Sequence, residues 1–449
     1  MPSIEPASRA PTITIGAVGD LYMGKPLHGE TDPGFIAAVQ ALRECDVRFA
    51  NLEIQLLSHP TVAAAQAPGA WAGAPAALAW DVAWLGVNVA STANNHAGDY
   101  GVDGLRQTEA ALRDLGIPHA GTGADLQLAL RPAMVDTRGG RVAVLAVSSS
   151  HLDHARAGRS RDDTPGRPGV APLRFGTRYR VDGEAYAALE RIREHLPVGK
   201  HREHPLARAY DDERGPALSL LGARFVRGKD FGVESWAAPD DAADIEAAVR
   251  AARRDADWVL LSMHTHEYDS RPDMPPGFAV EMGRRAIEAG ADAVIGHGAH
   301  GVRGVQLHRG RPIFHGIGAF VFQPYLFPTQ PADFFDAYAM RDESLADVYR
   351  ARRDSAGFYR RRSAWEALLV RLTCGRDGPP TFTLQPLTLW AEGEGPDGLP
   401  RLARNGEGLK LLEKVRDLSR ELGTDLRLDA AQHLLHGHGA AVSAQPRRQ

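Results

Sequence analysis

Short runs of apolar residues alternate with amphipathic segments along most of this chain. After the first run, Phe35, Ile36, Val39 and Leu42 recur at the spacing that places apolar side chains on one face of a helix. Runs that are apolar at nearly every position are typical of buried strands. The alternation predicts βαβ units and an α/β fold. The expected strands cover 12–19, 47–52, 87–92, 141–147, 257–263 and 292–296, and the expected helices cover 33–43, 76–84, 103–115 with Asp103 as N-cap, 241–254, 277–289 and 407–422.

Two stretches break this alternation. Residues 59–75 are rich in proline and glycine and are expected to form a loop. Residues 152–240 mix proline, glycine and charged residues with only short helical pieces such as 183–195, and such a long irregular segment is typical of an insertion or lid. Its arginines could clamp an anion, or they could belong to a solvated loop with interleaved aspartates. They are Arg156, Arg159, Arg161, Arg167, Arg174, Arg178 and Arg180.

The C-terminal third predicts antiparallel strands followed by a helix. From Gly304 to Phe322, two β runs flank an Arg309-Gly310 turn and are expected to form a hairpin. Residues 365–373 and 381–389 predict a closing pair of strands.

At 449 residues the chain exceeds the usual size of a single core, so we expect one large α/β domain with additions, or two domains. The expected parts are a disordered arm over 1–11, a main domain over 12–390 that contains the insertion 152–240, a C-terminal helical extension over 391–435 and a disordered tail over 436–449.

The composition argues against some classes of binding partner and indicates the cellular compartment. The formal net charge is −4, from 52 basic and 56 acidic residues, so there is no overall attraction to nucleic acid or to an anionic membrane. The two cysteines, Cys45 and Cys374, are too few for a disulfide framework. Neither a secretory signal nor a run long enough for a membrane span is recognisable. A cytoplasmic protein with no membrane span and no nucleic-acid partner is the expectation.

Five of the apolar runs end in side chains that bind metals. In an α/β sheet the carboxyl ends of parallel strands meet at one edge, so these side chains are expected to converge. Carboxylate, amide oxygen and imidazole together suit a divalent ion such as Zn, Mn, Fe or Ca, whose identity the pattern leaves open. The residues are Asp20, Glu53, Asn95 with His96, His264, and His297 with His300.

Six short motifs follow one another in the order Gly19-Asp20-Leu-Tyr-Met23, Asn51-Leu-Glu53, Ala93-Asn-Asn-His96, His264-Thr-His-Glu267, Gly296-His-Gly-Ala-His300 with Arg303-Gly304-Val305, and Pro312 to Phe322. Together they resemble the CapA family of poly-γ-glutamate capsule biosynthesis proteins over about residues 14–325. That family looks like a branch of the calcineurin-like metallophosphoesterases. The resemblance implies a four-layer α/β/β/α sandwich.

The resemblance also implies roles for individual residues. Asp20, Glu53, Asn95, His264, His297 and His300 match the metal ligands. His96 matches a general acid beside the metal, His266 is a second candidate for proton transfer, and Arg303 is expected to bind substrate.

Two departures concern the number of ions. Phosphoesterases have Asp-x-His where this chain has Asp20-Leu-Tyr22, and their final His-x-His is here His297-Gly-Ala-His300. One ligand is lost and one is moved, so the number of ions, one or two, stays open.

Three functions are compatible with these residues. The first is metal-dependent hydrolysis of an amide or phosphoester in a peptide or poly-γ-glutamate type substrate. The second is peptide epimerisation by acid and base groups at an α-carbon, as in some CapA-like proteins of peptide natural-product pathways. The third is non-catalytic binding of polyglutamate. Loss of activity, and not merely of binding, on removal of the metal would separate the enzymes from the binding protein.

Overall fold

The computed structural model describes residues 12–196, 217–355, 357–376, 378–391 and 395–437. The disordered N-terminal segment expected over 1–11 and most of the tail expected over 436–449 lie outside these ranges.

The larger sheet is built around β1, and ten of its strands lie in the described ranges. On one side, β1 pairs in parallel with β2. On its other side, the first half of β1 pairs antiparallel with β20, and its last residues pair in parallel with β19. The strand order is β23 (Arg427–Asp429), β24 (Leu434–Gly437), β21 (Thr381–Ala391), β20 (Glu366–Cys374), β1 (Ile13–Tyr22), β2 (Val47–Leu52), β5 (Val89–Ser91) and β6 (His119–Ala120), with β19 (Ala319–Phe322) on β1 and β22 (Gly395–Leu402) on β21.

The second sheet carries the histidine-bearing strands at its centre. Here β15 pairs in parallel with both β9 and β16, and every residue of β15 is buried. The order is β17 (Val305–His308), β18 (Arg311–Phe314), β16 (Ala293–His297), β15 (Trp258–His264), β9 (Gly140–Ser148) and β8 (Ala133–Thr137).

The two sheets pack face to face, and helices cover their outer faces. Side chains such as Ile15 and Phe49 from the first sheet meet Val144 and Leu260 from the second in one buried cluster. Helices α1 (Pro33–Arg43), α2 (Ala79–Trp84) and α3 (Gly101–Asp114) belong to the core outside the larger sheet, and α7 (Pro239–Asp255) and α8 (Gly277–Ala289) to the core outside the second. The expected α/β/β/α sandwich is therefore confirmed.

The C-terminal segment contributes more than the predicted helix. Helix α11 (Gly406–Glu421) buries Leu411, Leu412 and Val415 in the core between the sheets. The predicted extension also supplies β22, β23 and β24 to the larger sheet.

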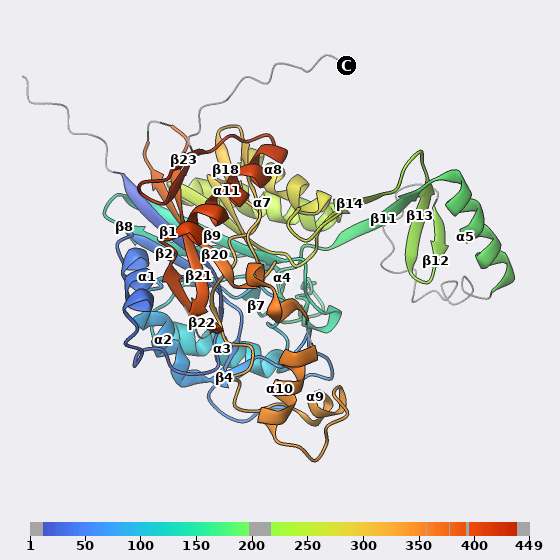
Figure 1. Ribbon diagram of the computed structural model, residues 1–449, viewed down its shortest axis with the longest axis horizontal. Coiled ribbons are helices and arrows are strands. Elements are labelled where there is room, and N and C mark those ends of the chain that lie inside the picture. Colours follow the sequence, from blue (N-terminus) through green and yellow to red (C-terminus); the bar gives the residue numbers. More distant parts are fainter. Residues whose placement is uncertain (1–11, 197–216, 356, 377, 392–394, 438–449) are drawn as a thin grey trace, which may run out of the picture.

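The prediction of an irregular insertion was wrong for much of 152–240. The described residues 175–196 and 217–237 form a four-stranded sheet and helix α5 (Gly183–His195), and this unit, here called the arm, projects from the body (Figure 1). The sequence does not show these strands clearly because charged residues alternate with apolar ones, and the charges pair across the sheet, as Arg178 does with Glu234 at 2.6 Å. The elements are β12 (Leu218–Leu220), β13 (Ala223–Arg227), β11 (Phe175–Val181), β14 (Gly232–Ala237) and α5 (Gly183–His195).

Two smaller predictions also need correction. The run from Gly304 to Phe322 forms the expected β17–β18 hairpin, but its last part, β19, crosses to the other sheet and pairs with β1. The helix expected from Asp103 begins at Gly101, and Asp103 lies in its first turn.

The remaining elements lie between these layers and around them. They are β3 (Gln55–Leu57) with β4 (Gly73–Pro75), β7 (Thr122–Gly123) with β10 (Gly169–Val170), α4 (Leu126–Ala129), α9 (Ala332–Asp336), α10 (Leu345–Ser355) and the 3₁₀ turns η1 (Ala76–Leu78), η2 (Asp153–Ala155), η4 (Gly357–Arg360) and η5 (Arg362–Trp365).

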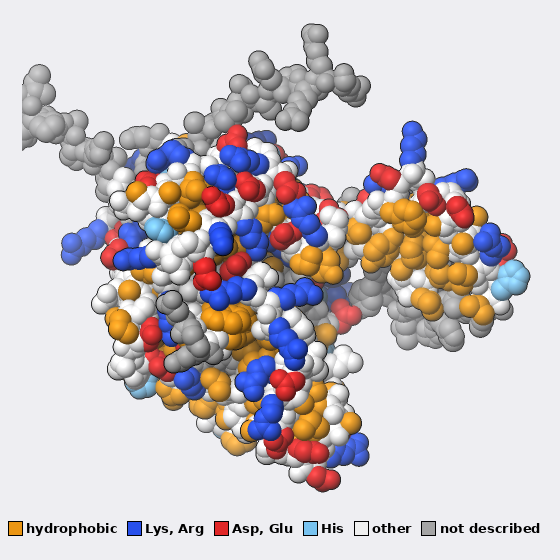
Figure 2. Space-filling model, in the orientation of Figure 1, with side chains coloured by type: hydrophobic (Ala, Val, Ile, Leu, Met, Phe, Trp, Pro, Cys, Tyr) orange, Lys and Arg blue, Asp and Glu red, His pale blue; other side chains and the backbone are white. Residues whose placement is uncertain are grey.

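Basic and acidic side chains are interspersed over the body in the view of Figure 2, in keeping with the small net charge. Within the described ranges, no helix has both the length and the apolar character that a bilayer crossing requires.

Candidate metal centre

The polar strand ends of both sheets meet at one place. Asp20 lies near the end of β1, and Glu53 directly follows β2. His264 and His297 are the last residues of β15 and β16, and they are register partners in the parallel ladder. The convergence that the strand ends predicted is therefore present, because neighbouring parallel strands end at the same edge of their sheet.

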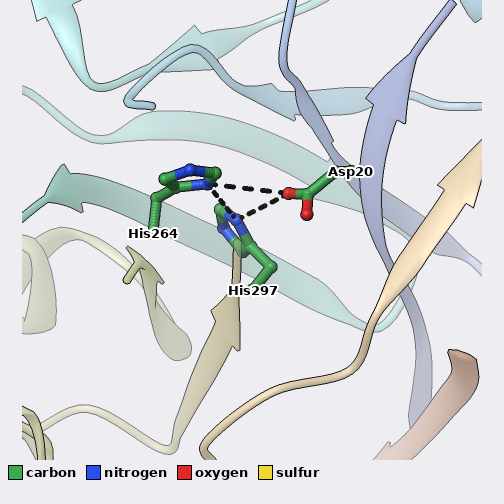
Figure 3. Close-up of side chains that lie close together, drawn as sticks. All are labelled: Asp20, His264 and His297. Carbon is green, nitrogen blue, oxygen red and sulfur yellow. Dashed lines mark hydrogen bonds and ion pairs between the residues drawn. The ribbon is translucent and has the colours of Figure 1, made fainter. Parts of the chain in front are cut away.

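The first group of side chains consists of Asp20, His264 and His297, which point toward one another (Figure 3). All three are fully buried. Oδ1 of Asp20 lies 3.0 Å from Nδ1 of His297 and 3.6 Å from Nδ1 of His264. The two Nδ1 atoms are 3.0 Å apart.

Partners outside this group hold it in place. Asn51 donates to Oδ1 of Asp20 at 2.8 Å, and the backbone N–H of Gly298 donates to Oδ2 at 3.0 Å. Gly298 has φ of 91°, and a Cβ there would lie 2.9 Å from the ring of His264, so both the conformation and the space require glycine. Oγ of Ser262 lies 2.7 Å from Nε2 of His297.

The electrostatics keep Asp20 charged. Burial alone would raise the pKa of its carboxyl, but hydrogen bonds and charge interactions with His264 and His297 outweigh burial and hold this pKa well below its ordinary value.

The second group consists of Glu53, His266 and His300. Glu53 is fully buried, and neither of its carboxylate oxygens has a hydrogen-bond partner among the described residues. His266 Nε2 lies 3.8 Å from Glu53 Oε1. Burial, with the charges of Asp20 and Asp99, raises the pKa of Glu53 well above its ordinary value. A buried carboxylate without partners is costly, and a cation beside it would remove that cost.

His264 and Asn95 connect the two groups. The outer nitrogen of His264, Nε2, lies 2.8 Å from Oδ1 of Asn95, 3.0 Å from Nε2 of His266 and 3.6 Å from Oε1 of Glu53. The same ring thus presents one nitrogen to each group. A neutral imidazole has only one free lone pair, so His264 can serve as ligand in one group at a time.

The imidazoles are in the state that metal ligands require. Burial lowers the pKa of His264 and of His300 to about 4, and burial together with His300 and His264 lowers that of His266 well below its ordinary value. Their rings are therefore neutral near pH 7, with a lone pair free to bind a cation. Carboxylates, an amide oxygen and neutral imidazoles fit a divalent ion.

His96 lies beside these groups and is held by a carboxylate. Its Nδ1 is 2.7 Å from Oδ2 of Asp99, and both residues are buried. The ring of Tyr22 lies 5.0 Å from the ring of His96. Asp99 also accepts from the backbone N–H of Ala72 at 2.7 Å, which fixes the carboxylate that orients the imidazole.

A pocket of about 370 Å³ opens onto the centre. Asn95, His96, His266 and His300 line it, so a bound molecule would contact members of the second group and the His96 ring. Its other walls are Tyr22, Pro68, Gly69, Ser150, Phe322, Arg352, Phe358 and Tyr359.

Arg303 does not lie where the sequence predicted a substrate contact. It is 2% exposed, does not line the pocket and donates to the backbone carbonyls of Glu267 at 2.7 Å and Pro272 at 3.2 Å. Arg303 thereby holds the loop that carries His266. Ser150 supports the same loop, because its Oγ accepts from the N–H of His266 at 2.8 Å and donates to Glu267 at 2.9 Å.

The sequence alone does not reveal several participants in this site. Asn51 lies in the Asn51-Leu-Glu53 motif, but the motif does not indicate its hydrogen bond to Asp20. Asp99 follows His96 by three residues, a spacing that could have suggested the pair. Arg352 lies in a segment without clear periodicity. His308, by contrast, pairs with Glu288 at the surface at 2.9 Å.

Most of the arginines of the insertion form ion pairs with acidic side chains. Arg174 pairs with Asp241 at 2.5 Å and Arg161 with Asp163 at 3.0 Å. This supports the solvated, ion-paired interpretation of these residues over an anion clamp.

Two facing sheets with a cluster of carboxylate and imidazole side chains at their strand ends define a metallophosphatase-like α/β protein. Comparison with known proteins specifies the family. The model of the bacterial capsule synthesis protein family PGA_cap matches residues 14–324. The chain therefore belongs to this capsule synthesis (CapA) family.

Individual relatives differ in how much of the chain they cover. Uncharacterized protein y4sH of Sinorhizobium fredii is 30% identical over 93% of this chain and 91% of its own length. A probable polyglutamine synthesis accessory protein of Mycobacterium tuberculosis is 30% identical over 51% of this chain and 44% of its own. The PGA biosynthesis protein CapA of Bacillus subtilis is 29% identical over 25% of this chain and 30% of its own.

Among solved structures, a hypothetical protein from Thermus thermophilus aligns over 87% of this chain and 98% of its own, with 14% identity and a TM-score of 0.30.

Proposed function

We propose that this chain is a metal-dependent enzyme that hydrolyses an amide or phosphoester bond in a peptide-like or polyglutamyl substrate. The observation that carries the proposal is the buried carboxylate of Glu53, next to His266 and His300, whose two oxygens have no hydrogen-bond partner among the described residues. The names of two relatives, which refer to polyglutamine synthesis and to PGA biosynthesis, support a substrate of this class.

The chain supplies ligands and proton-transfer groups for this chemistry. Glu53, Asn95, His266 and His300 would hold a divalent ion at the pocket, and the Asp20 group could hold another. When bound, such an ion activates water and polarises the scissile carbonyl or phosphoryl group. His96, oriented by Asp99, would deliver a proton from its Nε2 atom to the leaving group. Arg303 and Ser150 keep the His266 loop in position.

Epimerisation is a second candidate because two imidazoles border the same pocket. His96 follows a strand of the larger sheet and His266 follows a strand of the second sheet, and both line the cavity. One imidazole could remove a proton from an α-carbon while the other returns a proton to the opposite face.

A single experiment separates these possibilities. Metal-loaded protein is incubated with γ-glutamyl oligopeptides, and in parallel with a phosphodiester, in water labelled with heavy oxygen and in deuterium oxide. Mass spectrometry then follows the products. Cleavage with uptake of heavy oxygen, lost on chelation and restored by metal, is the expected result.

The other outcomes contradict the proposal in different ways. Uptake of deuterium at an α-carbon without cleavage would favour epimerisation over hydrolysis. Binding of polyglutamate that survives chelation, with no chemical change in any substrate, would favour a non-catalytic accessory protein.

A further inference from the structure

The pocket beside the candidate metal centre contains a buried arginine that has no counter-ion among the described residues. Arg352, in the last turn of α10, lines this pocket and is 9% exposed. Its Nη2 donates to Oη of Tyr359 at 2.9 Å, whereas Nη1 is buried and has no hydrogen-bond partner in the described ranges. Guanidinium groups stay charged at neutral pH, so burying one with a free donor is costly unless an anion meets it.

Aromatic rings and a close backbone hold this guanidinium in one position. Its central carbon lies 5.6 Å from the ring centre of Tyr359 and 5.7 Å from that of Phe334. A Cβ added at Gly69 would lie 3.1 Å from Nη2, so the loop before β4 also packs against the group. A charged group fixed in this way loses little conformational freedom when it binds a ligand.

The surroundings of Arg352 are continuous with the second group of metal ligands. The rings of Tyr359 and Phe358 are 5.1 Å apart, and the ring of Phe358 lies 5.2 Å from that of His300. One segment, α10 with η4, therefore brings the guanidinium and this aromatic wall to the side of the pocket where His300 lies.

We infer that Arg352 binds a carboxylate of the substrate and so anchors one end of it while the reacting bond lies at the metal centre. This rests on the proposed function for the position of the reacting bond. Among the described residues that line the pocket, Arg352 is the one Lys or Arg. A single charged donor suits a carboxylate monoanion, whereas a phosphate dianion with three strong acceptor oxygens calls for several donors. The aromatic wall suits an apolar group next to that carboxylate.

The test compares the binding of an acid and of its amide, which differ by one charge, and uses inorganic phosphate as a third probe. Isothermal titration calorimetry measures binding of N-acetylphenylalanine, its amide and inorganic phosphate to the full chain, both metal-loaded and chelator-treated. We expect the acid to bind about 10-fold or more tightly than the amide in both states, since a hydrogen bond to a charged group contributes about 1.5–3 kcal/mol. R352Q should abolish this preference, R352K should keep part of it, and the adjacent R353Q is the matched control that should keep it fully.

Four outcomes would overturn the inference. The first is that the wild type binds the acid and the amide equally, or binds neither detectably, and the second is that R352Q keeps the preference for the acid. The third is that the preference vanishes when the metal is removed, which would place the anion on the ion. The fourth is that phosphate binds more tightly than the acid. The wild-type comparison requires no variant, so it decides the matter even if R352Q fails to fold. Absence of turnover would contradict the proposed enzyme without affecting this comparison.

Discussion

At the scale of single residues, Glu53 distinguishes a metal site from a cluster of satisfied polar groups. The oxygens of Asp20 are hydrogen-bonded to Asn51 and Gly298, but those of Glu53 have no partner among the described residues. A cation bound beside Glu53 would remove the cost of burying its unpartnered carboxylate, so the second group is expected to hold its ion more tightly than the first.

The purified protein is accordingly expected to carry about one tightly bound equivalent of divalent metal, measured by elemental analysis after repletion and desalting. Glu53→Ala should lose it, because the variant removes the unpartnered carboxylate. His308→Ala is the control and should keep it, since His308 pairs with Glu288 on the surface.

A wild type that retains no metal after repletion would contradict a metal site here. If Glu53→Ala kept one equivalent while the wild type held two, the Asp20 group would have an ion of its own.

His96 is expected to move a proton and not to hold the ion. Its Nδ1 is engaged with Asp99, which leaves Nε2 for the substrate. His96→Asn should keep the metal and lose about 10²- to 10⁴-fold in turnover. Metal analysis and turnover number are measured on the same sample, with His59→Asn, an exposed histidine, as control. Joint loss of metal and activity would instead make His96 a ligand of the ion.

At the scale of elements, β1 carries Asp20 because its end is held between β2 and β19. The register of β1 shifts between Asp20 and Leu21 on the β19 side. Gly19 lies against the backbone at this point, and a Cβ there would be 1.7 Å from the carbonyl oxygen of Gly318. Two glycines on separate segments thus allow the close approach that brings β19 from the second sheet to the first.

Gly19→Ala should therefore destabilise the fold, because the added methyl meets backbone that cannot move aside. Overpacking costs typically about 1–3 kcal/mol, and backbone against backbone belongs at the upper end. Thermal unfolding followed by circular dichroism should show a midpoint several degrees lower. Gly29→Ala, with open space around its Cβ, should leave the midpoint unchanged. Equal midpoints for both variants would show that β1 and β19 can separate at no cost.

At the scale of the whole molecule, the arm and the body are structurally distinct. Helix α5 has no buried residue, and the arm meets the body through the paired ends of β11 and β14, where Phe175 is opposite Ala237. The exposed large apolar side chains of the described arm are Tyr179, Ile192, Leu196, Leu221 and Phe231, and Figure 2 shows hydrophobic side chains gathered on its visible face.

Removal of the arm should leave the body folded. Thr177 and Ser235 are opposite each other in the β11–β14 ladder, so an Asn-Gly turn can replace residues 178–234 and close a short hairpin. The hydroxyl of Ser235, which accepts from the N–H of Phe278, is retained. The shortened protein is expected to unfold within a few degrees of the full chain and to bind the same amount of metal. Loss of metal or of cooperative unfolding would mean that the arm supports the centre.

Much of the architecture and the convergence of the candidate ligands could be predicted because both depend on local pattern. Buried strands such as 257–263 are apolar at nearly every position, and their polar last residues must converge where parallel strands end. The predicted ligands Asp20, Glu53, Asn95, His264, His297 and His300 meet for that reason, and His266, which was expected to transfer a proton, lies among them. The residue types by themselves favour a divalent ion at this site.

The remaining features depended on contacts between segments that are distant in the chain. Only the packed structure decides that Arg303 donates to the backbone carbonyl of Glu267. It likewise decides that Glu53 has no hydrogen-bond partner among the described residues, and that Arg352 lines the same pocket as His266 and His300. The arm sheet and the crossing of β19 escaped prediction for the same reason, since strands with alternating charges and close glycine contacts are stabilised by pairing across the fold. Sequence periodicity reports which face of an element is buried, whereas the direction of a long polar side chain is determined by the neighbours that tertiary packing brings to it.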